Sequence, residues 1–212
     1  MIINWFGQTS FRIQGDKSVL ITDPFDASFG LKVPRYSADV VTLSDSNNEH
    51  LNAEAVKGTS ADSEPHIISV PGEYEVKSIF IIGVKPHGEK TNNLIYRFEI
   101  DGVTIGHLGN LDHVLSNGEL ERMEGVDILM IPVGGGKALN AKQATEIISQ
   151  LEPRIVIPMA YNIPGLKTKE KLDDLNAFCK EIGVCPKEKM AKFKVTKKDL
   201  PAEDLQVIVF EV

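Results

Sequence analysis

Short runs of apolar and β-branched residues, separated by turn residues, fill the first half of the chain and predict a strand-rich region. We expect strands at residues 2–6, 10–14, 18–22, 39–43, 66–70, 79–84, 93–100 and 103–108, and a β-rich run that begins at residue 74. Gly15-Asp16 and Asp101-Gly102 are typical of tight hairpin turns between two such strands. A short helix is expected at residues 51–56.

The spacing between apolar residues changes in the second half of the chain. Strands at residues 127–133, 154–159 and 205–211 alternate with helices at 118–124, 141–151 and 168–182. The last of these helices has Thr168 as its expected N-cap and Gly183 as its terminator. No low-complexity linker separates the two halves, so the pattern predicts one domain, residues 1–212, of two packed sheets flanked by helices.

One polar cluster follows a predicted buried strand directly. Asp45, Asn47, Glu49 and His50 lie within six residues, just after the apolar run that ends at residue 43. Asp and Asn favour turns because their side chains bond nearby backbone groups, which favours a solvated turn here. Asp, Glu and His also bind metals and transfer protons, and loops after strands often carry such functions. Local sequence alone favours the turn and leaves the site open.

Composition and net charge limit the classes of function expected for this chain. The 212 residues are 42% hydrophobic and carry a net charge of −7, which does not favour non-specific nucleic-acid binding. No run of eighteen apolar residues predicts a membrane span, and the first residues lack the pattern of a signal peptide. The spacing of Cys179 and Cys185 matches no zinc or redox motif, so we expect free thiols in a cytoplasmic protein.

Polar groups follow four predicted strands, at residues 45–50, 86–88, 107–111 and 157–161. Together with segments 3–11, 22–25, 71–76, 126–135 and 156–159, these loops resemble the metallo-β-lactamase superfamily over nearly the whole chain. The chain is most similar to a branch of zinc-dependent hydrolases related to ascorbate-phosphate lactonases. The resemblance implies an α+β, four-layer αββα sandwich whose site lies at one edge, between the two sheets.

The same resemblance implies seven site positions, but most have changed residue type. The family motif is His-x-His-x-Asp-His, followed by a distant His, a bridging Asp and a final His, which together hold two divalent ions. The matching positions here are Asp45, Asn47, Glu49, His50, His87, Asn110 and Ala160. Only His50 and His87 keep the family's residue type, and a neutral amide is a weak ligand for zinc. A family-type dinuclear centre is therefore not expected.

Two functions follow from this departure. We expect a protein that has kept the hydrolase fold but lost catalysis, a pseudoenzyme that binds no cofactor and interacts with a small molecule or another protein. Membrane and nucleic-acid partners are not expected, and a homo-oligomer is left open. The alternative is a metal-dependent hydrolase with one rebuilt site, in which Asp45, Glu49, His50 and His87 hold zinc, manganese or iron. Its substrate would be a phosphorylated compound, a lactone or a phosphodiester.

Several other polar residues are candidates for support of such a site. Asp23 matches a frequent family Asp, and either supports the site or anchors the loop before Pro24. His107 is expected to brace a strand end. The Gly134-Gly135-Gly136 run is expected to form a tight turn near the site. Weaker candidates are Asp112 as a replacement carboxylate, His113 beside it, and Lys137, Tyr161 and Lys167 as contacts for an anionic ligand.

Overall fold

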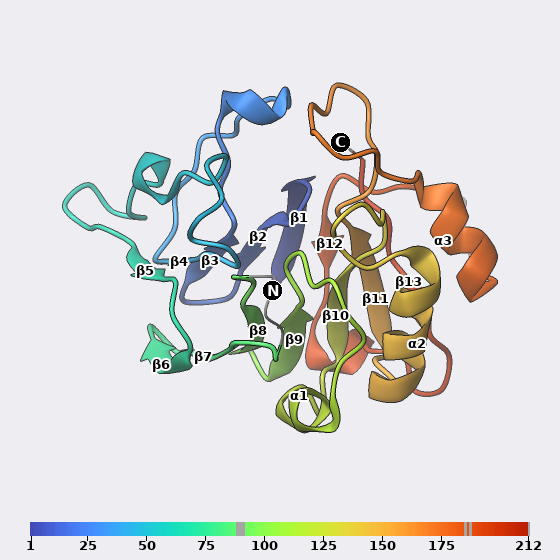
Figure 1. Ribbon diagram of the computed structural model, residues 1–212. Coiled ribbons are helices and arrows are strands. Elements are labelled where there is room, and N and C mark those ends of the chain that lie inside the picture. Colours follow the sequence, from blue (N-terminus) through green and yellow to red (C-terminus); the bar gives the residue numbers. More distant parts are fainter. Residues whose placement is uncertain (88–91, 185, 187, 212) are drawn as a thin grey trace.

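Two mixed β-sheets form the centre of the computed structural model, which describes residues 1–87, 92–184, 186 and 188–211. The first sheet has the order β12-β1-β2-β3-β4-β5 and the second the order β13-β11-β10-β9-β8-β7-β6 (Figure 1). The strands of the first sheet are β1 (Ile2–Gly7), β2 (Ser10–Gln14), β3 (Val19–Thr22), β4 (Val40–Thr42), β5 (His66–Ile68) and β12 (Phe193–Lys194). Those of the second are β6 (Gly72–Val76), β7 (Ile79–Val84), β8 (Ile95–Ile100), β9 (Val103–His107), β10 (Ile128–Pro132), β11 (Ile155–Met159) and β13 (Gln206–Val207).

Strand direction determines where loops can meet. β3, β4 and β5 pair in parallel, and so do β9, β10, β11 and β13, while the remaining pairs are antiparallel. The carboxyl ends of parallel strands lie at the same edge of a sheet, and ligands often bind in the crevice there. The loops that follow β9, β10 and β11 therefore converge at one edge.

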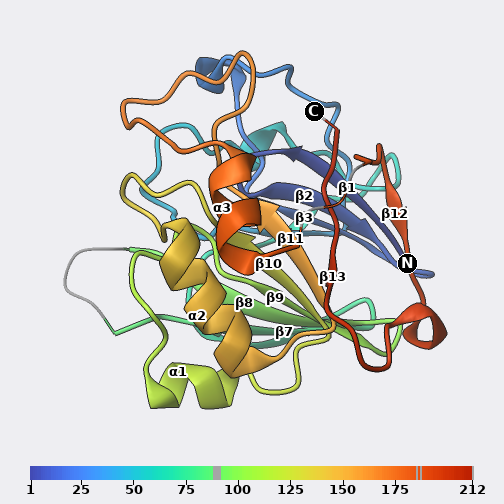
Figure 2. The ribbon, with the colours of Figure 1, turned by 90° about the vertical axis from the view of Figure 1, so that its right-hand side faces the viewer.

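The helices are short and few. They are α1 (Asn117–Arg122), α2 (Ala141–Leu151) and α3 (Leu175–Ile182), with 3₁₀ turns η1 (Ala27–Phe29), η2 (Ala53–Ala55) and η3 (Lys197–Asp199). α2 begins with a reciprocal Asn140–Gln143 capping box and buries Ala144, Ile147 and Ile148 on one face. Figure 2 shows α2 and α3 in front of the seven-stranded sheet, on its outer side.

The main core lies between the sheets and beneath these helices. Burial alternates along β1, where Ile3 and Trp5 point inward, as expected for a strand with one solvated face. Every residue of β10 and β11 is buried, because both faces of these strands are covered. A second, smaller cluster on the other face of β3 and β4 contains Val19, Ile21 and Val41, covered by Tyr36 and Val56 from the loops.

The predicted fold class is confirmed: two packed sheets are flanked on one side by helices, and the other outer layer is made of loops and 3₁₀ turns. The predicted strands of the first half and the helix at 141–151 are found with small shifts of their ends. The helix expected at 51–56 is the short η2 turn. The two-residue strand β12 was not predicted, and the last strand is shorter than expected.

The expected helix at 168–182 is wrong in its first half. α3 begins at Leu175, and its N-cap is Asp174, whose side chain accepts a hydrogen bond from the Ala177 N–H. The preceding segment is drawn away from a helical path by backbone hydrogen bonds, since Asp173 N–H donates to Gly134 O (2.8 Å) and Asn162 N–H donates to Asp173 O (2.8 Å). Tertiary contacts thus override the helical propensity of residues 168–174.

Cys179 lies within α3 and is disulfide-bonded, so the expectation of a free thiol is wrong for this residue. Cys185 lies outside the described residues. In the part of the chain that the structure describes, no helix has both the length and the apolar character to cross a membrane.

The buried carboxylate of Asp39 gives a test of the fold. It accepts hydrogen bonds from Val19 N–H (2.8 Å), Thr59 Oγ–H (2.6 Å) and Lys77 Nζ (2.6 Å). Burial alone would raise the pKa of Asp39, but these bonds outweigh burial and lower it. The stabilisation is therefore complete above the unfolded-state pKa of about 3.9 and is lost as pH falls through the lowered folded-state value.

We expect Asp39→Asn to lower the free energy of unfolding by about 2 kcal/mol at pH 7, and the difference from the unchanged protein to shrink at pH 3. Urea unfolding at the two pH values measures both quantities. Asp62→Asn, at an exposed loop position, is the control and should cost less than about 0.5 kcal/mol. An Asp39→Asn penalty that is equal at both pH values would contradict this account.

Candidate functional site

A cavity of about 470 Å³ opens where the loops after β4, β9, β10 and β11 meet. Six of the seven predicted site positions line it, namely Asp45, Asn47, Glu49, His50, Asn110 and Ala160. The loop around η1 and the loop before α3 lie at this same end of the molecule, above the two sheets (Figure 1). The structure therefore brings most of the predicted positions together at this edge.

The polar cluster after β4 is both a turn and a wall of the cavity. Asp45 Oδ1 accepts a hydrogen bond from Asn47 N–H (3.0 Å), and Asn48 Oδ1 accepts one from His50 N–H (3.1 Å). These are side-chain-to-backbone bonds of the kind that stabilise Asx turns. The two interpretations of this segment are therefore compatible.

His50 is held by two contacts from η1. Its Nδ1 lies 2.6 Å from Ser28 Oγ, and its ring stacks on Phe29 at a centroid distance of 4.7 Å and an angle of 30°. The neighbouring Glu49 extends toward the opposite loop, where Oε1 lies 3.5 Å from Lys169 Nζ. Both side chains therefore already have partners within the protein.

His87 does not reach the cavity. Its side chain is 88% exposed, and its backbone N–H donates to Glu119 Oε1 (2.6 Å) at α1. The same Oε1 atom of Glu119 also lies 3.4 Å from His113 Nε2. Burial would lower the pKa of His113, but Asp112 and Glu119 outweigh burial and raise it. The expected convergence of His87 with His50 is wrong, because the loop after β7 turns toward α1.

The sequence prediction missed Asn93, which positions the neighbouring loop. Asn93 is buried, its Nδ2 donates to Leu108 O (3.0 Å), and its Oδ1 accepts from Asn110 N–H (2.8 Å). Asn93 and Asn92 both line the cavity. An available signal was the Asn-Asn pair one residue before β8, whose amino end lies at the same edge as the carboxyl end of β9.

Asp23 supports the cavity-lining loop after β4, which agrees with the first of the two roles expected of it. The fully buried carboxylate accepts hydrogen bonds from Ser44 N–H and Ser44 Oγ–H, each at 2.6 Å, and so fixes the residue before Asp45. Burial raises the pKa of Asp23, against the lowering effects of His107 and Ser44. His107 is itself buried, with its pKa lowered by burial, and its Nε2 lies 2.8 Å from Thr9 O, so it braces the strand end as expected.

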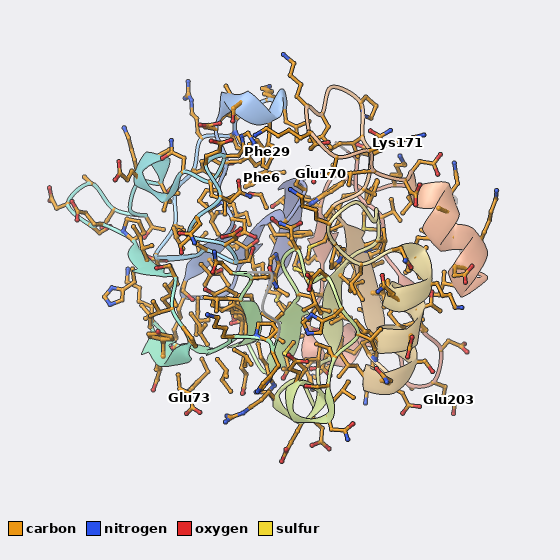
Figure 3. All side chains as sticks on the ribbon, viewed as in Figure 1. Phe6, Phe29, Glu73, Glu170, Lys171 and Glu203 are labelled. Atoms are coloured by element: carbon orange, nitrogen blue, oxygen red, sulfur yellow. The ribbon has the colours of Figure 1, made fainter. Side chains whose placement is uncertain are left out.

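The opposite wall comes from the second half of the chain. Gly135, Lys137, Ala138 and Ala160 line the cavity beside Thr168, Lys169, Glu170 and Leu172. Lys137 Nζ pairs with Glu170 Oε1 at 2.7 Å, which joins the loop after β10 to the loop before α3. Figure 3 shows Phe29, Glu170 and Lys171 at this end of the molecule, far from Glu73.

The glycine run after β10 forms a tight turn, as predicted. A Cβ at Gly134 would lie 2.3 Å from Ala160 O, so only glycine allows the two loops to approach. Two of the weaker ligand candidates are not among the cavity-lining residues: Tyr161 is buried, with its pKa raised by burial, and Lys167 donates its backbone N–H to Phe29 O (2.8 Å). Lys137 alone of the predicted anion contacts lines the cavity.

The donor set does not fit the family's pair of metal ions. Asp45, Glu49 and His50 line the cavity, but the other family positions there are two amides and an alanine. Among the described residues, no three His, Cys, Asp or Glu side chains converge so that they could hold one ion. Catalytic zinc ordinarily has three protein ligands. The lining residues therefore do not fit a metal centre of the family type.

Comparison with known proteins identifies relatives of the whole scaffold. Residues 2–160 match the model of the Beta-lactamase superfamily domain. A UPF0173 metal-dependent hydrolase from Thermococcus onnurineus is 27% identical over 190 residues, which is 76% of this chain and 84% of the relative. A metal-dependent hydrolase of the same group from Archaeoglobus fulgidus is 24% identical over 205 residues, covering 82% of this chain and 88% of the relative.

Two solved structures share the architecture. A protein of Thermotoga maritima, assigned to the zinc-dependent hydrolases of the metallo-β-lactamase superfamily, superposes with a TM-score of 0.79 and 30% identity over 99% of this chain and 97% of its own. The metallo hydrolase Igni18 of Ignicoccus hospitalis has a TM-score of 0.62 and 17% identity over 99% and 94% of the two chains, and this likeness shows the fold alone.

Gly109 provides a test of the site's framework. Its φ is +56°, and a Cβ there would lie 2.4 Å from Asn93 Oδ1 and 2.6 Å from Ser44 Cβ. We expect Gly109→Ala to cost about 1–2 kcal/mol of unfolding free energy from backbone strain, and about 1–3 kcal/mol more from the overlap. Thermal or urea unfolding measures the loss.

Gly102→Ala is a matched control, because Gly102 also has a positive φ of +74° but no atom lies within 4 Å of the added Cβ. It should show the strain cost without the overlap. Equal losses in the two variants would mean that Ser44 and Asn93 do not restrict the space at Gly109.

Proposed function

Because the chain belongs to the metallo-β-lactamase superfamily, we propose that its cavity at the family's site position binds a polar small molecule bearing hydroxyl or carboxylate groups, without the family's pair of metal ions. The relatives are metal-dependent hydrolases, and this group sets the broad class of the protein. Their description gives no support to a complete loss of catalysis.

The lining of the cavity is the observation that carries this proposal. It contains five asparagines, Asn47, Asn48, Asn92, Asn93 and Asn110, together with Gln8. Amides both donate and accept hydrogen bonds, which suits a ligand with several hydroxyl groups. Phe29 and Leu172 add apolar surface beside them, and specific sites commonly combine such surface with a few placed polar groups.

The charges around the cavity favour a ligand with hydroxyl and carboxylate groups over a strong polyanion. Lys137 and Lys169 are available to a carboxylate, but they already pair with Glu170 and Glu49. Both lysines are strongly exposed, at 85% and 83%, so these ion pairs are weak and a ligand group can replace either partner.

A second candidate function is that of a metal-dependent hydrolase, the class to which the relatives are assigned, here rebuilt with a single ion. One observation favours it: Asp45, Glu49 and His50 line the same cavity, and each is a residue type that binds zinc or manganese. His87, which the sequence had added to this set, lies outside the cavity-lining residues and is left out.

Ligand binding is tested by thermal shift with a panel of sugars, sugar acids and sugar phosphates. A ligand at 100 times its dissociation constant stabilises the folded state by about 2.7 kcal/mol, which corresponds to about 5–10 °C in Tm at this chain length. We expect the shift to be lost in Asn110→Leu, which replaces a hydrogen-bonding amide of the cavity wall with an apolar side chain of similar size, and kept in His87→Ala. Shifts that survive Asn110→Leu would place binding elsewhere and contradict the proposal.

Metal binding separates the two candidates. Protein freed of metal with a chelator is titrated with zinc and then manganese in a calorimeter. We expect no stoichiometric binding of two ions per chain. One ion that is lost in Asp45→Ala and His50→Ala but kept in His87→Ala would support the single-ion hydrolase, and two tightly bound ions would contradict the main proposal.

A further inference from the structure

A chain of hydrogen bonds from η1 ends at His50. Ser28 Oγ contacts Asp26 Oδ1 on one side and His50 Nδ1 on the other, the latter at 2.6 Å. Asp26 Oδ1 also accepts the backbone N–H of Ser28 (2.8 Å), so the carboxylate caps η1 and faces the hydroxyl at the same time. The three residues therefore form one connected series, Asp26–Ser28–His50.

Counting protons along this series determines the state of the imidazole. A serine hydroxyl has one hydrogen to donate, and an ionised carboxylate can only accept. The single hydrogen of Ser28 Oγ must therefore point to Asp26. The contact between Ser28 Oγ and His50 Nδ1 then requires a hydrogen on Nδ1, with the hydroxyl oxygen as its acceptor.

The orientation of the ring is fixed by contacts on more than one side. Asp26 N–H donates to the backbone carbonyl of His50 (3.1 Å), and the Phe29 ring stacks against the imidazole. With Nδ1 turned to Ser28, Nε2 is on the far side of the ring. No described residue forms a hydrogen bond with Nε2, and His50 lines the cavity.

We infer that Asp26 and Ser28 are positioning residues that hold neutral His50 as its Nδ1–H tautomer, so that Nε2 offers a lone pair to the cavity. The functional consequence rests on the function proposed above: Nε2 accepts a hydrogen bond from a hydroxyl or N–H group of the ligand. The tautomer itself does not depend on any ligand. A donor-bearing ligand is thereby selected over one that has only acceptors at this point.

His107 supplies a comparison within the same molecule. Its Nε2 lies 2.8 Å from the carbonyl oxygen of Thr9, which can only accept, so Nε2 carries the hydrogen. The Nδ1 of His107 is buried and has no hydrogen-bond partner among the described residues. The two imidazoles are therefore expected to be opposite tautomers.

The test is a long-range ¹H–¹⁵N correlation spectrum of the ligand-free protein at about pH 8.5, above the reference pKa of imidazole. Protonated and unprotonated ring nitrogens have well-separated ¹⁵N shifts. We expect His50 as Nδ1–H and His107 as Nε2–H. In Ser28→Ala the His50 nitrogens should move toward the Nε2–H pattern that free histidine prefers, while Ser28→Thr, which keeps the hydroxyl, should retain Nδ1–H.

Asp26→Ala gives an independent variant, because the Ser28 hydroxyl is then free to donate to Nδ1 and the Nδ1–H fraction of His50 should fall. Unchanged His107 resonances show that each variant is folded. An Nε2–H pattern for His50 in the unchanged protein, or a Ser28→Ala spectrum identical to it, would overturn the inference. The spectra are recorded without ligand, so these outcomes test the tautomer of His50 alone. Failure of the proposed ligand binding would be seen only in the thermal-shift panel.

Discussion

The buried carboxylate of Asp23 is the interaction on which the cavity depends. It accepts hydrogen bonds from the backbone N–H and the hydroxyl of Ser44, and so ties the end of β3 to the loop that follows β4. Ser44 O in turn accepts the Leu94 N–H at 2.6 Å, which links the first sheet to the segment before β8. From there Asn93 holds Asn110. One carboxylate without solvent contact thus sets the relative position of loops from both sheets, and such a fully bonded polar network specifies one arrangement.

Backbone strain occurs around the same edge, as it does in several turns elsewhere. Gln8, Asp23 and Ala160 all have positive φ values, of 51°, 43° and 52°, although none is glycine. Such conformations cost free energy and persist only where the surroundings impose them. Two sets of hydrogen bonds impose these conformations: those that Ser44 donates to Asp23, and the one that the Ala160 N–H donates to Gln8 O (3.3 Å). The hydrogen bond from Ala160 to Gln8 joins the two sheets at the cavity, because Gln8 follows β1 and Ala160 follows β11.

The strands could be predicted because they follow from the local pattern of apolar residues, whereas the positions of the candidate site came from the resemblance to the metallo-β-lactamase superfamily. The sequence could not predict where His87 lies, since its backbone is bound by Glu119, thirty-two residues away. The predicted start of α3 was wrong for a similar reason. Asp173 forms backbone hydrogen bonds with Gly134 and Asn162, and bonds between segments far apart in the sequence do not change the hydrophobic periodicity. Asn93 was missed because a buried amide before a strand looks like any turn residue until its partners at Leu108 and Asn110 are known.

The wall formed by Thr168, Lys169, Glu170 and Leu172 lies beyond residue 160, where the match to the superfamily domain ends. The loops after β4 and β9, by contrast, fall inside it. The cavity is therefore built from loops inside the match to the superfamily domain and from a segment that lies beyond it. Substitutions between α3 and β11 can change the shape and charge of the cavity without disturbing the sheets, so related chains with one scaffold are free to diverge in what they recognise.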